Sequence, residues 1–199
     1  MTTTVQTIKP LGARVYLHEY YELCKPRVVM LIVFTAIIGM FLAVPGMPPL
    51  HLLFCGTLGI TLQSASAAAV NQIIDRNIDT RMARTCGRPL VTGTLGMTES
   101  IAFATVIGLF GFVVLWFLVN PLTAVLTQLA LIGYAGVYTR FLKRATPQNI
   151  VIGGAAGAAP PVLGWVAVTG QVDPHSLLLF LIIFVWTPPH FWALAIERH

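Results

Sequence analysis

Three polar residues recur at intervals of four at the end of a long apolar run: Asn71, Asp75 and Asp79. If the run continues as a helix, their side chains lie on one face in successive turns. One amide oxygen and two carboxylates then point the same way. Mg²⁺ prefers one or two carboxylates together with water and phosphate oxygens. We therefore predict that Asn71, Asp75 and Asp79 bind a magnesium ion.

Two arginines follow this group, again four residues apart. Arg84 and Arg88 are suited to bind phosphate, because a guanidinium group matches phosphate oxygens with two parallel hydrogen bonds. Carboxylates, a divalent ion and arginines around one position predict a diphosphate site, with all five residues as its catalytic group. The segment contains no Walker-type glycine loop, so the sequence does not favour nucleotide hydrolysis.

Each of these residues also has a simpler structural interpretation. Asn71 alone could form a hydrogen bond between helices, and the arginines alone could fix the topology. Asp75 or Asp79 alone could pair with a cation at the membrane surface. Their joint spacing favours the diphosphate site, because ionisable and amide groups at the mouth of an apolar bundle are functional by default.

The composition predicts the elements that position these residues. The 199-residue chain is 56% hydrophobic and 10% charged, with a mean hydropathy of +0.81, so it lacks the polar surface of a soluble domain. Its apolar runs match a hydrocarbon layer about 30 Å thick, and they lack the alternation of barrel strands. The fold class is therefore all-α, a polytopic transmembrane helical bundle. The six predicted helices are residues 28–44, 50–70, 101–119, 122–138, 150–168 and 177–196.

The basic residues predict the orientation of this bundle. All 12 Lys and Arg residues occur in alternate connections, so the positive-inside rule places the N-terminus and residues 71–88 on the cytoplasmic side. We divide the chain into a cytoplasmic segment, residues 1–27, and a transmembrane domain, residues 28–199. Residues 1–21 lack the composition of a transit peptide, which favours a bacterial inner membrane. The lipid bilayer is an expected partner, and nucleic acid is not.

The spacing of the three predicted metal ligands resembles the first aspartate-rich motif, Asn-x3-Asp-x3-Asp, of the intramembrane prenyltransferase superfamily. The two arginines, followed by Thr85 and Pro89, extend the motif as in one branch, the protoheme IX farnesyltransferase family. Residues 25–27, 138–161 and 186–195 also resemble that branch. The resemblance covers nearly the whole chain, and its last stretch is the most specific for the haem branch.

This resemblance implies transfer of a farnesyl group from farnesyl diphosphate to a vinyl group of haem B, with water added, to give haem O. Haem B is then a substrate, and Mg²⁺ stabilises the departing diphosphate. A downstream haem-modifying enzyme is an expected partner. Tyr138, Phe141 and Trp192 are alternatives for stabilising the allylic cation through their rings. The basic residues expected to bind the diphosphate charge are Arg84, Arg88, Lys143 and Arg144.

His190 lies toward the predicted cytoplasmic end of the sixth helix, near the depth of the diphosphate site. Its imidazole could approach the haem iron or a propionate. Pro188 and Pro189 are expected to break the helix there, where a wide planar substrate must enter. The alternative is a histidine that is hydrogen-bonded within a kinked helix.

The resemblance also implies a nine-helix bundle with a second aspartate-rich motif after the sixth helix. This chain ends at His199, before such a motif, so we expect an N-terminal fragment of about six helices that is inactive alone. Two other functions stay open. One is prenylation of an aromatic acid or quinone precursor, and the other is a transporter in which Asp75 and Asp79 carry a cation.

Overall fold

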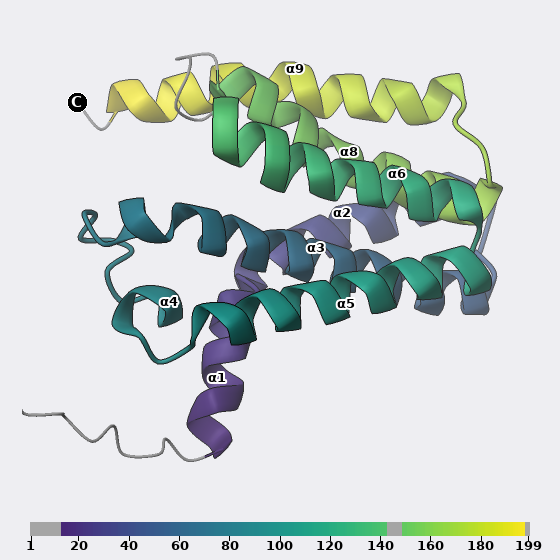
Figure 1. Ribbon diagram of the computed structural model, residues 1–199. Coiled ribbons are helices and arrows are strands. Elements are labelled where there is room, and N and C mark those ends of the chain that lie inside the picture. Colours follow the sequence, from purple (N-terminus) through teal and green to yellow (C-terminus); the bar gives the residue numbers. More distant parts are fainter. Residues whose placement is uncertain (1–12, 143–148, 198–199) are drawn as a thin grey trace, which may run out of the picture.

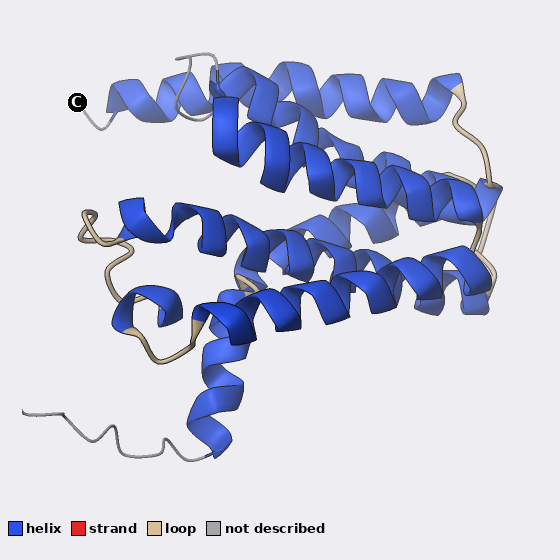
Figure 2. Cartoon of the chain, in the orientation of Figure 1, coloured by secondary structure: helices blue, strands red, loops and turns tan. Residues whose placement is uncertain are grey.

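All regular secondary structure in the described residues is helical, as the composition predicts. The computed structural model describes residues 13–142 and 149–197, and no strand occurs in these residues (Figure 2). The helices, labelled as in Figure 1, are α1 (Ala13–Leu23), α2 (Pro26–Leu42), α3 (Leu50–Asp79), α4 (Pro89–Thr92), α5 (Met97–Leu118), α6 (Pro121–Ile132), the π-helix η1 (Gly133–Leu142), α8 (Asn149–Thr169) and α9 (Pro174–Glu197).

Figure 1 shows two layers of helices, with α6, α8 and α9 in one and α3 and α5 in the other. Helix α2 packs against both α3 and α8 and so joins the layers, whereas α1 projects from the bundle at 56° to α2. The C-terminal ends of α3 and α9 lie at the same end of the molecule as α4. The α2–α3, α5–α6 and α8–α9 connections lie at the other end. The arginines of the α3–α4 segment therefore gather at one end, as the charge pattern predicts.

Close helix packing forms the centre of the bundle. A Cβ atom added to Gly39 would overlap the carbonyl oxygen of Pro161, and one added to Gly164 would overlap that of Ala36. The backbones of α2 and α8 are thus in direct contact, as small residues allow in membrane bundles. The buried residues of this core are Ala36, Met40, Ile60, Leu115, Ala124, Leu163 and Ala167.

A buried polar contact also joins helices inside the bundle. Gln63 on α3 donates through Nε2 to the carbonyl oxygen of Gly108 on α5 at 3.2 Å and to Gln128 Oε1 on α6 at 3.1 Å. Gln63 is 1% exposed. Such bonds fix the rotation of one helix against another, because an amide in an apolar interior must find a partner.

Helices cover all six predicted spans, but the fourth is not a uniform α-helix. Helix α6 ends at Ile132, and the chain continues as the π-helix η1. Among the residues described, three helices are long and apolar enough to cross a membrane, namely α3, α5 and residues Pro174–Ala193 of α9. The number is four if the bent pair α1 and α2 counts as one span. The count of six crossings stays a prediction.

The predicted break at Pro188 and Pro189 is wrong, because α9 runs through both residues. Proline removes a backbone donor and ordinarily ends or kinks a helix. In an apolar layer, however, an extended chain would leave still more backbone groups without partners. Thr187, directly before the two prolines, donates through Oγ1 to the carbonyl oxygen of Ile183 one turn earlier at 2.7 Å.

The contact between α2 and α8 predicts a position-specific effect of an added methyl group. Gly164→Ala should lower the free energy of unfolding by about 1–3 kcal/mol, since the backbones must move apart to accommodate Cβ. The matched control is Gly157→Ala in the same helix, where no atom of another helix lies within 4 Å of the added Cβ. The measurement is thermal unfolding in detergent micelles, followed by circular dichroism. Equal midpoints for the two variants would contradict the backbone contact.

Candidate diphosphate site

The three predicted metal ligands lie together on the last turns of α3. Because the helix continues unbroken to Asp79, the four-residue spacing places Asn71, Asp75 and Asp79 along one face. Asn71 Nδ2 donates to Asp75 Oδ2 at 3.3 Å, which confirms that neighbouring members meet. All three side chains are buried, with exposed fractions of 4%, 2% and 4%. The predicted constellation therefore exists as a buried oxygen-rich face.

Two residues that sequence reasoning did not assign to the site contact Asn71. Lys25, at the junction of α1 and α2, donates through Nζ to Asn71 Oδ1. Thr139 on η1 accepts at Oγ1 from Asn71 Nδ2 at 3.0 Å and is completely buried. Lys25 did carry a signal, because it precedes Pro26 in one of the stretches that resemble the family. Thr139 lies in another such stretch, but nothing in its spacing relates it to Asn71.

Arg88 reaches the site although it belongs to a different element. Its guanidinium forms an ion pair with Asp79 Oδ2. Arg88 is the residue preceding α4, and this short helix is held against α3 by a hydrogen bond from Arg76 Nε to the carbonyl oxygen of Leu90 at 3.1 Å. Thr85 adds a bond from Oγ1 to the carbonyl oxygen of Asp79 at 3.1 Å. The α3–α4 connection thus folds back over the end of its own helix.

The other predicted site residues have different positions. Arg84 is exposed on the same connection and forms no ion pair with the three ligands in the described part of the chain. Tyr138 is partly buried, and its ring stacks on Tyr134 with centroids 5.7 Å apart. An added Cβ at Gly153 would lie 2.7 Å from the Tyr138 ring, so this ring packs against α8. Lys143 and Arg144 lie outside the described residues.

His190 lies on α9 and is not brought into contact with the oxygen-rich face among the residues described. It is exposed, and its ring stacks on Trp186 with centroids 4.3 Å apart and meets Phe191 edge-on. The described contacts of this ring are therefore aromatic. Helix α9 packs against α8, and Figure 1 shows its C-terminal end at the same end of the molecule as the end of α3.

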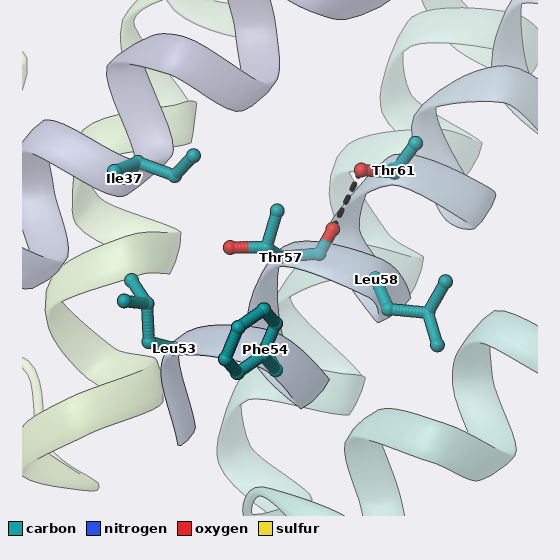
Figure 3. Close-up of a pocket in the computed structure, with 6 residues that line it drawn as sticks. All are labelled: Ile37, Leu53, Phe54, Thr57, Leu58 and Thr61. Atoms are coloured by element: carbon teal, nitrogen blue, oxygen red, sulfur yellow. Dashed lines mark hydrogen bonds between the residues drawn. The ribbon is translucent and has the colours of Figure 1, made fainter. Parts of the chain in front are cut away.

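The site is separate from the apolar groove on α2 and α3. This groove has a volume of about 420 Å³ and is drawn in Figure 3. Thr61, its lining residue nearest to the site, precedes Asn71 by ten residues, or about 15 Å of helix. The residues that line the groove are Ile37, Leu53, Phe54, Thr57, Leu58 and Thr61.

Among the residues described, no group of three His, Cys, Asp or Glu side chains could hold a metal ion. The diphosphate site itself offers two carboxylates and one amide, from Asp75, Asp79 and Asn71.

Curated proteins with high sequence similarity share one name. The chain is 60% identical over 196 residues to a protoheme IX farnesyltransferase of Nitrosococcus oceani, and 60% identical over 196 residues to that of Methylococcus capsulatus. In both cases the match covers 98% of this chain and 65% of the relative. It is also 62% identical to the protein of that name from Marinobacter nauticus, over 90% of this chain and 60% of the relative. The chain thus spans less than two thirds of the length of these relatives.

The fold is similar to that of a solved membrane protein. A UbiA homolog from Archaeoglobus fulgidus bound to DMAPP and Mg²⁺ superposes with a TM-score of 0.69 and 18% sequence identity, over 86% of this chain and 62% of that one. The same homolog bound to GPP and Mg²⁺ gives a TM-score of 0.68. The model of the UbiA prenyltransferase family matches residues 32–199. This integral membrane chain therefore belongs to the UbiA prenyltransferase family, as its aspartate-rich motif predicts.

Proposed function

We propose that the protein to which this chain belongs transfers a farnesyl group from farnesyl diphosphate to a vinyl group of haem B. The observation that carries the proposal is the buried face of Asn71, Asp75 and Asp79, with Lys25 and Arg88 in contact with it. The shared name of the three relatives supports the choice of farnesyl and haem as substrates.

The proposed reaction breaks one C–O bond and forms one C–C bond and one new C–O bond. The C–O bond between the farnesyl group and diphosphate breaks, and diphosphate leaves with the bonding electrons. The vinyl group supplies the electrons for a new C–C bond to the farnesyl carbon. Water then adds to the other vinyl carbon and releases a proton, which gives the hydroxyalkyl group of haem O.

The donor set of the site fits Mg²⁺. Two carboxylates and one amide oxygen lie on one helix face, and an ion bound there retains positions for water and phosphate oxygens. Bound Mg²⁺ supplies Lewis-acid stabilisation of the diphosphate leaving group. The C-terminal end of α3 adds a partial negative charge that favours a cation at this position.

We further propose that the basic residues around this face bind the diphosphate. Arg88 pairs with Asp79 through one edge of its guanidinium, and the remaining donors of the group are of the kind that binds phosphate oxygens. Lys25, with three donors, is positioned beside Asn71. Arg84 lies on the same connection, at the exposed rim. Lys143 and Arg144 are proposed for the same role from the sequence.

We propose that aromatic residues stabilise the allylic cation and bind the haem acceptor. Tyr138 directly precedes Thr139, which contacts Asn71. The ring of Tyr138 is therefore our candidate to stabilise the allylic cation. His190 is proposed to bind haem through the iron or a propionate, because its imidazole is exposed and stacks on the ring of Trp186. A downstream haem-modifying enzyme stays the proposed recipient of the product.

The two aspartates should be essential and individually irreplaceable. Asp75→Asn and Asp79→Asn should each lower turnover by at least about 100-fold, since each removes a charge that holds the metal against the leaving group. The assay measures haem O by mass spectrometry after incubation with farnesyl diphosphate, haem B and Mg²⁺. The protein assayed is a fusion of this chain with the part of the Nitrosococcus oceani relative that this chain does not match.

The control for this assay is Asp173→Asn. Asp173 lies at the opposite end of the bundle, where its Oδ1 accepts from the backbone amides of His175 and Ser176 and its Oδ2 accepts from Trp165. This variant should retain activity. Near-normal turnover in Asp75→Asn or Asp79→Asn would contradict the metal assignment. Diphosphate release with a phenolic acid, and not with haem, would favour a quinone-type acceptor, and cation flux without release would favour a transporter.

We propose that the N-terminus and the site face the cytoplasm of a bacterial inner membrane, and the native cysteines test this orientation. Cys86 is exposed on the α3–α4 connection, whereas Cys24 is partly buried between α1 and α2. Burial raises the pKa of the Cys24 thiol to about 11, so little of it is the reactive thiolate at neutral pH. A membrane-impermeant maleimide should therefore label Cys86 first.

We expect Cys86 to be labelled fast in inverted membrane vesicles and not to be labelled in intact spheroplasts. Mass spectrometry of tryptic peptides identifies the labelled thiol, and Cys86→Ser is the control that removes it. Labelling of Cys86 in intact spheroplasts, with the reverse result in inverted vesicles, would show that the proposed orientation is wrong.

A further inference from the structure

The carboxamide of Asn71 is fixed by contacts at both of its polar atoms. Nδ2 donates to Asp75 Oδ2 at 3.3 Å and to Thr139 Oγ1 at 3.0 Å. Oδ1 accepts from Lys25 Nζ. The amide hydrogens are therefore directed along α3 and toward η1, and the carbonyl oxygen faces the ammonium group of Lys25.

The chemistry of the two partners determines this orientation. The hydroxyl of Thr139 has one hydrogen, and it donates that hydrogen to the carbonyl oxygen of Tyr134 at 2.8 Å. Only its lone pairs are then available to Asn71, so Thr139 must face Nδ2. An ammonium group has donors and no acceptor, so Lys25 must face Oδ1. Two independent contacts thus assign the same orientation to the amide.

The π-helix is what allows Thr139 to act in this way. In the preceding α-helix, the hydroxyl of Thr127 donates to the carbonyl oxygen of Thr123, four residues earlier, at 2.7 Å. Thr139 instead bonds to Tyr134, five residues earlier, in the wider turn of η1. Its side chain is completely buried against α3. A π-helical turn inside a longer helical span frequently marks a functional site.

We propose that Thr139 is a positioning residue, which aims Asn71 Oδ1 at the cation of the diphosphate site. The inference rests on the proposed function, because it assumes that Asn71 is a metal ligand. Without the hydroxyl, Nδ2 loses its acceptor on η1, and only the contacts with Asp75 and Lys25 then oppose rotation of the amide. A rotated amide presents its hydrogens to the cation and so repels it. Thr139 itself touches neither the ion nor the diphosphate.

The test compares Thr139→Val with Thr139→Ser. The fused protein of the turnover assay, purified in detergent, is titrated with Mn²⁺ in the presence of inorganic diphosphate, and free Mn²⁺ is followed by electron paramagnetic resonance. Thr139→Val should weaken Mn²⁺ binding by about 10-fold or more, the range found when the group that orients a metal ligand is lost. Thr139→Ser keeps the hydroxyl and should restore the wild-type affinity.

Two controls separate positioning from a general loss of structure. Thr127→Val removes another buried hydroxyl, from α6, and should leave Mn²⁺ binding unchanged. In an Asn71→Leu background, Thr139→Val should have no further effect, because the residue acts through Asn71. Equal weakening by Thr139→Val with and without Asn71, or failure of Thr139→Ser to restore binding, would overturn the inference.

The same titration distinguishes this inference from the proposed function. If the fused protein with the wild-type sequence binds no Mn²⁺, or if its Asp75→Asn variant binds Mn²⁺ equally well, the metal site itself is overturned. If the wild type binds and Asp75→Asn does not, the metal site stands. In that case, undiminished Mn²⁺ affinity in Thr139→Val overturns the positioning role alone.

Discussion

Two carboxylates buried at the end of an apolar bundle impose the main constraint on this structure. Asp75 and Asp79 are almost fully inaccessible, and an ionised carboxylate in such a place must be paired with donors or cations. Asp79 is paired with Arg88, and Asp75 accepts from Asn71. The chain on both sides of α3 is therefore arranged to bring positive charge and hydrogen-bond donors to one face of that helix.

A second apolar cluster packs the elements around the end of α3 against one another. It consists of Leu23, Ala69, Leu90, Leu95 and Ala104, which come from α1, α3, α4, the α4–α5 connection and α5. The four-residue helix α4 is too short to be stable alone. Burial of Leu90 and the bond from Arg76 to its carbonyl oxygen hold α4 in place. The position of Arg88 at the start of α4 thus depends on packing as well as on charge.

The sequence predicted the part of the site that lies on one regular helix. The spacing of Asn71, Asp75 and Asp79 was sufficient because α3 is continuous through all three. The same argument does not extend to Arg84 and Arg88, which are also four apart, because α3 ends at Asp79. Arg88 reaches the site only because the connection folds back, and Arg84 is left exposed.

Contacts between distant segments could not be predicted in this way. Lys25 and Thr139 are separated from Asn71 by 46 and 68 residues, and periodicity relates only residues on one element. The change from α6 to the π-helix that carries Thr139 falls inside the fourth predicted span, which is predicted from the sequence as one helix. The continuity of α9 through Pro188 and Pro189 was missed for another reason, since the cost of unpaired backbone groups in an apolar layer outweighs the local preference of proline.

The junction of α1 and α2 shows how strongly the site depends on the protein backbone. Lys25 has a φ of 51°, a left-handed conformation that costs a non-glycine residue roughly 1–2 kcal/mol and is further disfavoured before proline. Gln72 offsets this cost by donating from Nε2 to the carbonyl oxygens of Glu22 and Leu23, which end α1. Asn71 and Gln72 are adjacent on α3, so one helix turn holds both the backbone of the junction and the ammonium group of Lys25. Such strain persists only where surrounding contacts determine it, and here those contacts belong to the helix that carries the oxygen-rich face. The direction of α1 and the position of the Lys25 charge are consequently set by the same two neighbouring side chains.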